Sequence, residues 1–393
     1  MRDETFDVAA PAAAPESTQA GSRRGAGNVP KMRDIAAAAG VSQSTVSRVL
    51  NGTSSSIPIG EGTKDRVLAA AQELGYRPNP LARGLRGAAT MLVGVIVRDI
   101  TDPLYAGVLE ALARAARTHG YNVVLGTVHG AADEAVALTA VLETRHCDAI
   151  VLLGEMRDQP RLMAELEKTQ VPTVAAWAGS RRLGMPVAGV DNLAGVTAAV
   201  EYLLGLGHRR VGLIAGRRFV DFVERRTAWL EALTAHQLPP PVSYCQWATN
   251  DPASAGAAML ELMDLPEPPT AVIASTDIMA IGALHAAESH GLHVPVDISV
   301  VGFDDLPISA FMNPALTTVH MPIWEIARIV IDEAIARVNP DQRHRPFTAH
   351  VVRPWLVIRD SCAPPRDALG APVVNMREAL VTTPGDGGPP CCD

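Results

Sequence analysis

The chain of 393 residues is too long for one ordinary domain. Hydrophobic residues make up 48% of it and charged residues 19%, so we expect a buried core and exclude a wholly disordered or fibrous protein. No apolar run is long enough to span a membrane, which predicts no membrane partner. Residues 1–28 contain no apolar segment of the kind found in secretory signals, and we expect them to form a disordered extension.

The five cysteines predict neither a disulfide framework nor a metal site, because their number is odd and no Cys-x-x-Cys pair occurs. Reduced thiols, and with them a cytoplasmic location, are the simplest interpretation. Charge is distributed unevenly. The whole chain has a formal net charge of −8, yet residues 29–87 carry eight Lys and Arg side chains against four Asp and Glu. This basic segment indicates a contact with nucleic acid, although a solvated basic surface would give the same count.

Residues 29–77 are predicted to form three short helices. The first has one apolar face, made by Met32, Ile35, Ala36 and Ala39. Gly40 ends it, and Ser42 is suited to cap the second helix. That second helix turns three apolar residues inward: Val46, Val49 and Leu50. The third helix begins between Gly60 and Thr63 and is expected to bury Val67, Leu68, Ala71 and Leu74.

Two short helices around a turn that contains glycine are typical of the helix-turn-helix, whose second helix lies in the major groove of DNA. A small helical bundle without a DNA role is the alternative. In the helix-turn-helix interpretation Gln43, Ser44 and Arg48 can reach base edges or a phosphate. Contacts to phosphate and sugar are expected from Ser42, Thr45, Ser47 and Asn51. For Thr45, packing against the turn is the alternative role.

Residues 78–89 favour either a plain linker or a very short helix. Asn79 is suited to cap a helix, Pro80 to its first position and Gly87 to its end. Such a helix would have fewer than ten residues and would contain Gly84, so it would be only marginally stable by itself.

Residues 90–362 alternate between apolar runs and helical stretches. The runs expected to be strands are Leu92–Val97, Asn122–Leu125, Ala149–Leu153, Val171–Ala176, Arg210–Ala215, Ala271–Ala274 and Ile298–Phe303. The helices expected between them include Leu104–His119, Ala131–Arg145, Leu193–Leu206 and Ile278–His290. This alternation predicts an α/β fold with two doubly wound subdomains and a ligand cleft at the carboxyl ends of the strands. Residues 363–393, rich in Pro, Gly and charge, are expected to be a disordered tail.

Enzymatic interpretations find little support. The sequence has no phosphate-binding loop, dinucleotide fingerprint, zinc-protease motif or nucleophile elbow, so we predict no enzyme activity, no cofactor and no metal. His208 is interpreted as a structural residue. A secreted solute-binding protein would explain the α/β body, but it would not explain the basic helical head.

Specific motifs resemble those of a known family. Met32–Ala36, Gly40–Gly52 and Ala71–Asn79 are similar to the DNA-binding head of the LacI/GalR family of transcriptional regulators. The body resembles the periplasmic-binding-protein-like effector and dimerisation domain of the same family. The matching segments there are Thr101–Tyr105, His119–Tyr121, Val190–Asn192, Leu206–Val211, Ala274–Ala280, Val300–Asp305 and Leu316–Val319. The resemblance covers about residues 31–365.

The resemblance implies a homodimeric repressor that binds a near-palindromic operator and responds to a small molecule, a sugar or sugar derivative. Residues 78–89 would form a hinge helix, and Leu85 would enter the minor groove as a wedge between base steps. Further DNA contacts are implied at Tyr76, Ala82 and Arg86.

The family pattern also implies where the effector binds: Leu104, Tyr105, Asp221, Arg225, Trp247, Thr276 and Asp304. An arginine fork such as that of Arg225 can hold hydroxyls or a carboxylate, Asp304 can accept from two hydroxyls, and Trp247 can stack on a sugar face. The alternatives are a surface ion pair between Arg225 and Glu224 or Asp221, a turn cap for Asp304 and a core position for Trp247. Two residues depart from the family pattern. Thr276 stands where Asn is usual, and Trp177 stands at a strand end where an acid is common.

Overall fold

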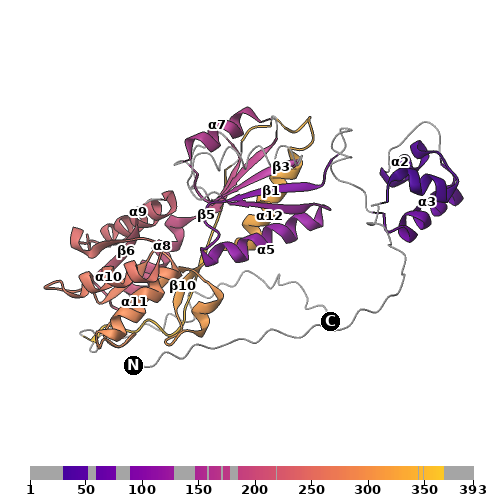
Figure 1. Cartoon of the computed structure of the whole chain (residues 1–393). Helices are drawn as coiled ribbons and strands as arrows, with labels where there is room; N and C mark the ends of the chain where they lie inside the picture. Colours follow the sequence, from indigo (N-terminus) through magenta and orange to yellow (C-terminus); the bar gives the residue numbers. More distant parts are fainter. Residues whose placement is uncertain are drawn as a thin grey trace, which may run out of the picture. The chain divides into compact units, whose positions relative to one another are not determined.

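The protein is described by a computed structural model that covers residues 30–51, 59–76, 89–127, 147–156, 159–169, 171–177, 185–217, 219–343, 345–347 and 349–366. The chain divides into two compact units, Met1–Arg83 and Gly84–Asp393 (Figure 1). Several predicted segments lie outside the described residues: the N-terminal extension, residues 78–88 of the hinge, the helix at 131–145 and the tail from residue 367.

The first unit contains the three predicted helices of the head: α1 (Met32–Ala39), α2 (Gln43–Asn51) and α3 (Glu61–Glu73). All four apolar residues predicted for α1 are buried, and they pack with Val46 and Val67. The prediction for α3 was partly wrong. Leu68 and Leu74 are 52% and 38% exposed, because Val67, Ala70 and Ala71 form the face that packs against the other two helices.

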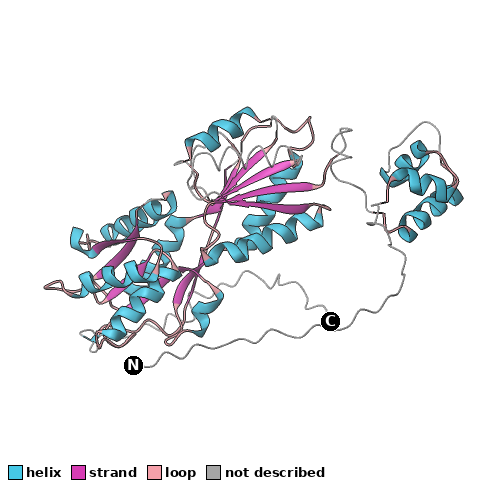
Figure 2. Ribbon diagram, in the orientation of Figure 1, coloured by secondary structure: helices cyan, strands magenta, loops and turns pink. Residues whose placement is uncertain are grey.

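The second unit has two lobes. The described strands of the first lobe form a parallel sheet in the order β11-β5-β4-β3-β1-β2. They are β1 (Leu92–Val97), β2 (Asn122–Thr127), β3 (Ala149–Leu153), β4 (Thr173–Ala176), β5 (Val187–Val190) and β11 (Ala349–Val352). The helices of this lobe are α5 (Pro103–Thr118), α7 (Pro160–Lys168) and α12 (Ile323–Ala336). Val95 faces the apolar cluster that includes α5 and α12, whereas Ile96 packs with Leu162 of α7, so both faces of the sheet are covered (Figure 2).

The second lobe has the strand order β12-β10-β9-β8-β6-β7, in which only the β10–β12 pair is antiparallel. Its strands are β6 (Val211–Gly216), β7 (Cys245–Ala248), β8 (Ala271–Ala274), β9 (Ser299–Asp304), β10 (Thr317–His320) and β12 (Trp355–Val357). Its helices are α8 (Asn192–Gly205), α9 (Val220–Ala235), α10 (Pro252–Met263) and α11 (Asp277–Ser289), with the 3₁₀ helices η1 (Val242–Tyr244) and η2 (Pro307–Phe311). The predicted α/β class with a small helical head is confirmed, and β1, β3 and β8 have the predicted bounds.

The chain passes between the two lobes at three points: Asp191 after β5, Met321–Pro322 after β10, and Arg353–Pro354 after β11. Two of these crossings touch, since the backbone N–H of Asp191 donates to the carbonyl of Val352 at 2.9 Å. Such crossings are where two lobes can rotate about each other.

His208 is a structural residue, as predicted. Its buried ring contacts the hydroxyls of Thr270 at 2.8 Å and Ser299 at 3.1 Å, and the carbonyl of Ala363 at 2.9 Å. Ala363, the residue after the predicted boundary at 362, is hydrogen-bonded to Ser299 as well as to His208.

Candidate functional site

The head presents the start of α2 to solvent. Gly40 ends α1 in the left-handed conformation, with φ of 66°, and its N–H donates to the carbonyl of Ala36. Ser42 then caps α2, because its hydroxyl accepts from the N–H of Thr45 at 3.1 Å. The chain is thereby turned so that Ser42, Gln43 and Ser44 are exposed at the start of α2.

The other predicted DNA contacts are less uniformly placed. Thr45, Ser47 and Arg48 are partly buried on α2, and Thr45 shares a 2.8 Å hydrogen bond with the hydroxyl of Ser42. Tyr76 packs against the apolar cluster of the head. Four more predicted contacts lie outside the described part of the chain: the side chain of Asn51, and Ala82, Leu85 and Arg86.

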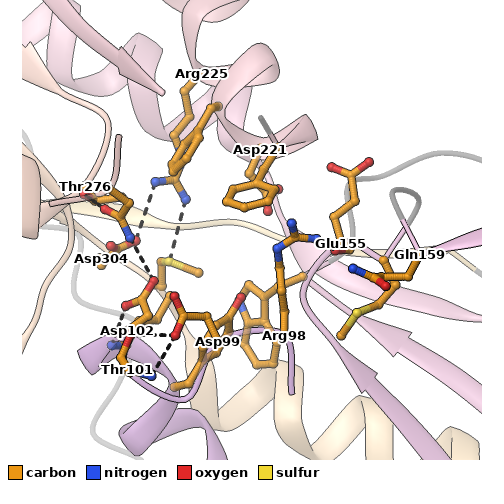
Figure 3. Close-up of a pocket in the computed structure, with 18 residues that line it drawn as sticks. Arg98, Asp99, Thr101, Asp102, Glu155, Gln159, Asp221, Arg225, Thr276 and Asp304 are labelled. Atoms are coloured by element: carbon orange, nitrogen blue, oxygen red, sulfur yellow. Dashed lines mark hydrogen bonds and ion pairs between the residues drawn. The ribbon is translucent and has the colours of Figure 1, made fainter. Parts of the chain in front are cut away.

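A cavity of about 480 Å³ lies between the two lobes of the second unit. It is lined by residues that follow the carboxyl ends of strands, where parallel sheets bind ligands. The first lobe contributes Arg98, Asp99, Thr101, Asp102, Leu104, Tyr105, Glu155, Met156, Gln159 and Trp177. The second lobe and its crossing contribute Phe219, Asp221, Phe222, Arg225, Asn250, Thr276, Asp304 and Met321. Figure 3 shows Thr276 and Asp304 on one side and Glu155 and Gln159 on the other.

Arg225 is a buried anchor of this cavity rather than a surface residue. The guanidinium of this α9 residue donates through Nε to Asn192 Oδ1 at 2.9 Å and through Nη1 to the carbonyl of Ser275, and it lies over the ring of Phe303. Nη2 lies 3.9 Å from the sulfur of Met321. A thioether sulfur is only a weak hydrogen-bond acceptor. Among the described residues, Nη2 therefore has no strong acceptor.

Asp304, the last residue of β9, lies 3.6 Å from Arg225 Nη1, measured from its Oδ1. This oxygen is buried and has no hydrogen-bond partner among the described residues. Burial raises the pKa of the carboxyl well above its ordinary value of 3.8, and Arg225 only partly offsets this effect. The backbone of Asp304 has a φ of 120°, so the structure holds this residue in a conformation that L-residues rarely adopt.

Asp221 contacts Arg225 through an intermediary. Asn192 accepts from Arg225 and donates to Asp221 Oδ1 at 2.9 Å and to Glu224 Oε2 at 2.8 Å. Burial raises the pKa of Asp221 to about 6, which Arg225 and Asn192 act to lower. The alternative interpretation, a surface ion pair of Arg225 with either acid, is thus replaced by a buried network centred on Asn192.

Three contacts join the lobes across the cavity. Asn250 donates to Asp102 Oδ2 at 2.9 Å and accepts from the Thr276 hydroxyl at 2.7 Å. The N–H of Val220, at the start of α9, donates to Glu155 Oε2 at 2.6 Å. The guanidinium of Arg98 lies 4.2 Å from the ring centre of Phe219. These contacts form only while the lobes are together.

Asn250 also links two helix caps. Asp102 caps α5 by accepting from the N–H of Leu104 at 3.0 Å, and Thr276 caps α11 by accepting from the N–H of Met279 at 3.2 Å. Thr276, at the position where the family pattern has Asn, therefore supplies a hydroxyl that both caps its own helix and holds Asn250.

The structure brings together six of the seven predicted effector residues: Leu104, Tyr105, Asp221, Arg225, Thr276 and Asp304. Trp247 does not line the cavity. It is 38% exposed on β7, and its ring lies beneath the guanidinium groups of Arg217 and Arg226. Four residues that line the cavity were not among the predicted ones: Arg98, Glu155, Trp177 and Asn250. The rule that ligands bind at strand ends could have found them, since each follows a strand.

The chemistry of the cavity is that of a binding site. Its polar groups are carboxylates, amides and guanidiniums arranged around a partly apolar wall. Among the described residues there is no group of three His, Cys, Asp or Glu side chains placed to hold a metal ion. None of the described helices has the length and apolar character needed to cross a bilayer.

Known proteins match both units. Residues 31–79 match the family model of bacterial regulatory proteins of the lacI family, and residues 200–362 match that of a periplasmic binding protein-like domain. The transcriptional repressor CytR of Escherichia coli strain K12 is 34% identical over 298 residues, which cover 76% of this chain and 86% of that protein. The regulator GalS of Salmonella typhimurium is 34% identical over 312 residues, covering 77% and 88%.

Solved structures agree with these relatives. A lac repressor dimer bound to operator and the anti-inducer ONPF has a TM-score of 0.74 at 26% identity, over 86% of this chain and all of that one. A complex of the transcriptional regulator CelR with cellobiose has a TM-score of 0.62 at 30% identity, over 84% and 99%. The chain belongs to the LacI family of bacterial regulatory proteins. Its relatives are transcriptional regulators, in agreement with the prediction that it is not an enzyme.

Proposed function

We propose that the protein is a homodimeric repressor that binds a near-palindromic operator and whose operator affinity is changed by a small carbohydrate. The observation that carries the proposal is the combination in one chain of a capped, exposed recognition helix and a two-lobed body with a polar cavity. Because its proposed partner is DNA, we place the protein in the cytoplasm. Residues 29–77 serve as the DNA-binding head, residues 78–89 as the hinge and the following body as the effector domain.

Base reading is assigned to Gln43, Ser44 and Arg48, with backbone contacts from Ser42, Thr45, Ser47, Asn51 and Tyr76. The exposed first turn of α2 supports this assignment, since recognition helices contact bases with their N-terminal residues. Ala82, Leu85 and Arg86 are assigned to the minor groove on the sequence pattern alone.

The carbohydrate assignment is supported by the polar groups in the cavity. Arg225 Nη2 offers a donor and Asp304 Oδ1 an acceptor, a pair that suits a hydroxyl. A similar regulator was solved with cellobiose, a disaccharide.

Dimerisation is supported by apolar surface on the second lobe. Phe311 is 83% exposed and Ile308 is 53% exposed, both on η2. Next to them, Ile281, Leu284 and Met312 line a hollow of about 330 Å³. An exposed apolar patch of this kind marks an interaction surface, and a similar repressor was solved as a dimer.

The direct experiment is to sequence the DNA fragments that the full-length protein selects from a genomic library, and then to titrate the protein on the recovered site. We expect an inverted repeat and an affinity that falls steeply with salt, because Lys and Arg release counterions from DNA. Arg48→Ala should weaken binding by about 1–3 kcal/mol if this residue contacts a base. Arg33→Ala, which changes a basic residue of α1, is the matched control for charge. Selection of unrelated fragments would contradict the proposal.

A further inference from the structure

We infer that the effector is an uncharged, hydroxyl-rich molecule and that the indole N–H of Trp177 donates a hydrogen bond to it. The inference rests on the proposed function, because it takes the cavity between the lobes as the effector site. It adds a specificity-determining residue that stands outside the predicted contacts.

The first observation concerns unpaired polar atoms. Among the described side-chain atoms that are buried without a hydrogen-bond partner, only Trp177 Nε1 and Asp304 Oδ1 belong to residues that line the cavity. Both residues are well buried, with 4% and 6% of their surface exposed. A buried donor or acceptor without a partner is costly, so each of these atoms is expected to find its partner on a bound ligand.

The backbone of Trp177 points to the same conclusion. Its φ of 52° lies in the left-handed region, which a bulky aromatic residue rarely adopts. The conformation is held by the sheet, since the N–H of Trp177 donates to the carbonyl of Ala188 at 3.0 Å. Asp304 has positive φ as well, so both residues with unpaired atoms in the cavity have strained backbones. Strain of this kind collects at ligand sites, where the fold can enforce it.

The charged residues that line the cavity indicate which ligand charge it can accept. Five acids line it, against the two guanidiniums of Arg98 and Arg225. Four of the acids already accept from protein donors: Asp99 from Thr101, Asp102 from Leu104 and Asn250, Glu155 from Val220, and Asp221 from Asn192. The fifth, Asp304, lies beside Arg225.

An anionic ligand would therefore be repelled by a surplus of carboxylates. An ammonium group could donate to Asp304, but it could not accept from Trp177. The unpaired groups instead require a ligand that donates to Asp304 and accepts from Trp177. A hydroxyl does both without carrying charge. An uncharged polyol or sugar satisfies these demands, whereas a phosphorylated sugar, a sugar acid or an amino sugar does not.

The test uses full-length protein and sets of probes that differ in charge. Glucose is compared with glucose 6-phosphate, glucuronate and glucosamine, and ribose with ribose 5-phosphate. Galactose and cellobiose extend the uncharged set. Binding is measured by thermal shift and then by calorimetry. We expect at least one uncharged probe to bind, and its charged counterparts to bind about tenfold more weakly or worse.

The role of Trp177 is tested with a matched pair of variants. Trp177→Phe removes the indole N–H in the cavity. Trp229→Phe removes another buried indole N–H without a hydrogen-bond partner, on a residue that does not line the cavity. We expect Trp177→Phe to weaken binding of the best uncharged probe about fivefold, the worth of one neutral hydrogen bond. Trp229→Phe should leave that affinity unchanged.

Three other results would each contradict one claim: the ligand class, the role of Trp177, or the regulation of DNA binding. If a phosphorylated, acidic or amino counterpart binds as tightly as the uncharged probe, or if no uncharged probe binds, the ligand class is wrong. If Trp177→Phe and Trp229→Phe bind the best uncharged probe with equal affinity, Trp177 does not contact the ligand. If the probe binds as inferred but leaves operator affinity unchanged, the inference stands and the proposed regulation of DNA binding fails.

Discussion

Asp221 is a carboxyl group whose ionised form is disfavoured by the fold. Its pKa is about 6, above the ordinary value of 3.8, because burial outweighs the nearby Arg225 and Asn192. A raised acid pKa contributes stability that is complete below the unfolded value and is lost as the pH rises through the folded one. The residue therefore couples the stability of the cavity wall to pH.

Asp221→Asn should change this dependence in a defined way. The free energy of unfolding of the wild type, minus that of the variant, should fall between about pH 4 and about pH 6 and stay flat above. Denaturant unfolding over that range is the measurement. Asp251→Asn is a control of opposite sign, since hydrogen bonds from Ser254 and Thr249 lower the pKa of Asp251. A flat difference for Asp221→Asn would contradict burial as the cause.

The single residues show where sequence reasoning works and where it stops. Arg225 and Asp304 could be predicted because each has a recognisable spacing or strand-end position. Trp247 was expected in the cavity, but β7 turns its ring toward Arg217 and Arg226. The bridge formed by Asn250 had no local signal, because its partners Asp102 and Thr276 are distant in the sequence.

Glycine has opposite effects at two places in the head. Gly40 ends α1 with φ of 66°, whereas Gly62 lies in the first turn of α3, and an added Cβ would meet open space at both. Gly40→Ala should therefore destabilise the head by about 1 kcal/mol through backbone strain alone. Gly62→Ala should be neutral or stabilise it by up to about 1 kcal/mol through helix propensity.

Thermal unfolding of full-length protein, followed at a reporter in the head, separates the two variants. Because neither residue meets a steric clash, the sign of each change reports backbone conformation. If Gly40→Ala were as stable as Gly62→Ala, the left-handed end of α1 would be wrong, and with it the angle at which α2 leaves the turn.

At the level of elements, the strands in the middle of each sheet were the predictable ones. β1, β3 and β8 are buried on both faces and so appear in the sequence as continuous apolar runs. The edge strands β7 and β11 each bury only one of their four residues, and neither Cys-Gln-Trp-Ala nor Ala-His-Val-Val is a continuous apolar run. These strands form because each pairs with the backbone of a neighbouring strand, β6 for β7 and β5 for β11. A local sequence pattern carries no information about such a neighbour.

The whole second unit depends on the contacts that join its lobes. Asn250→Ala would remove the bridge between Asp102 and Thr276, leaving a partly buried carboxylate with one donor fewer. We expect effector affinity to fall about tenfold or more, as befits a hydrogen bond to a charged group, while operator affinity without effector is kept. Gln246→Ala, in which the lost partner is the Ser243 carbonyl, is the matched control. Equal effector affinities in the two variants would argue against the bridge.

The exposed apolar surface of η2 gives a prediction about assembly. Phe311→Glu places a charge where we propose that two copies meet, and it should convert the dimer to a monomer in sedimentation experiments. Val242→Glu alters an even more exposed apolar residue, at 91%, outside η2. It should leave the dimer intact. Dissociation in both variants would mean that the effect is not specific to η2.

The three crossings between the lobes also govern how the protein is made. The sheet of the first lobe is incomplete until its edge strand, β11, pairs with β5. Its core is also incomplete until α12 packs beside α5. Both elements follow the entire second-lobe segment from α8 to β10. At a synthesis rate of about 5–20 residues per second, the first lobe waits on the order of ten seconds on the ribosome with an uncovered apolar face. Its early half thus exposes apolar surface throughout synthesis of the second lobe, and a truncation late in the chain would remove elements of the lobe that was begun first.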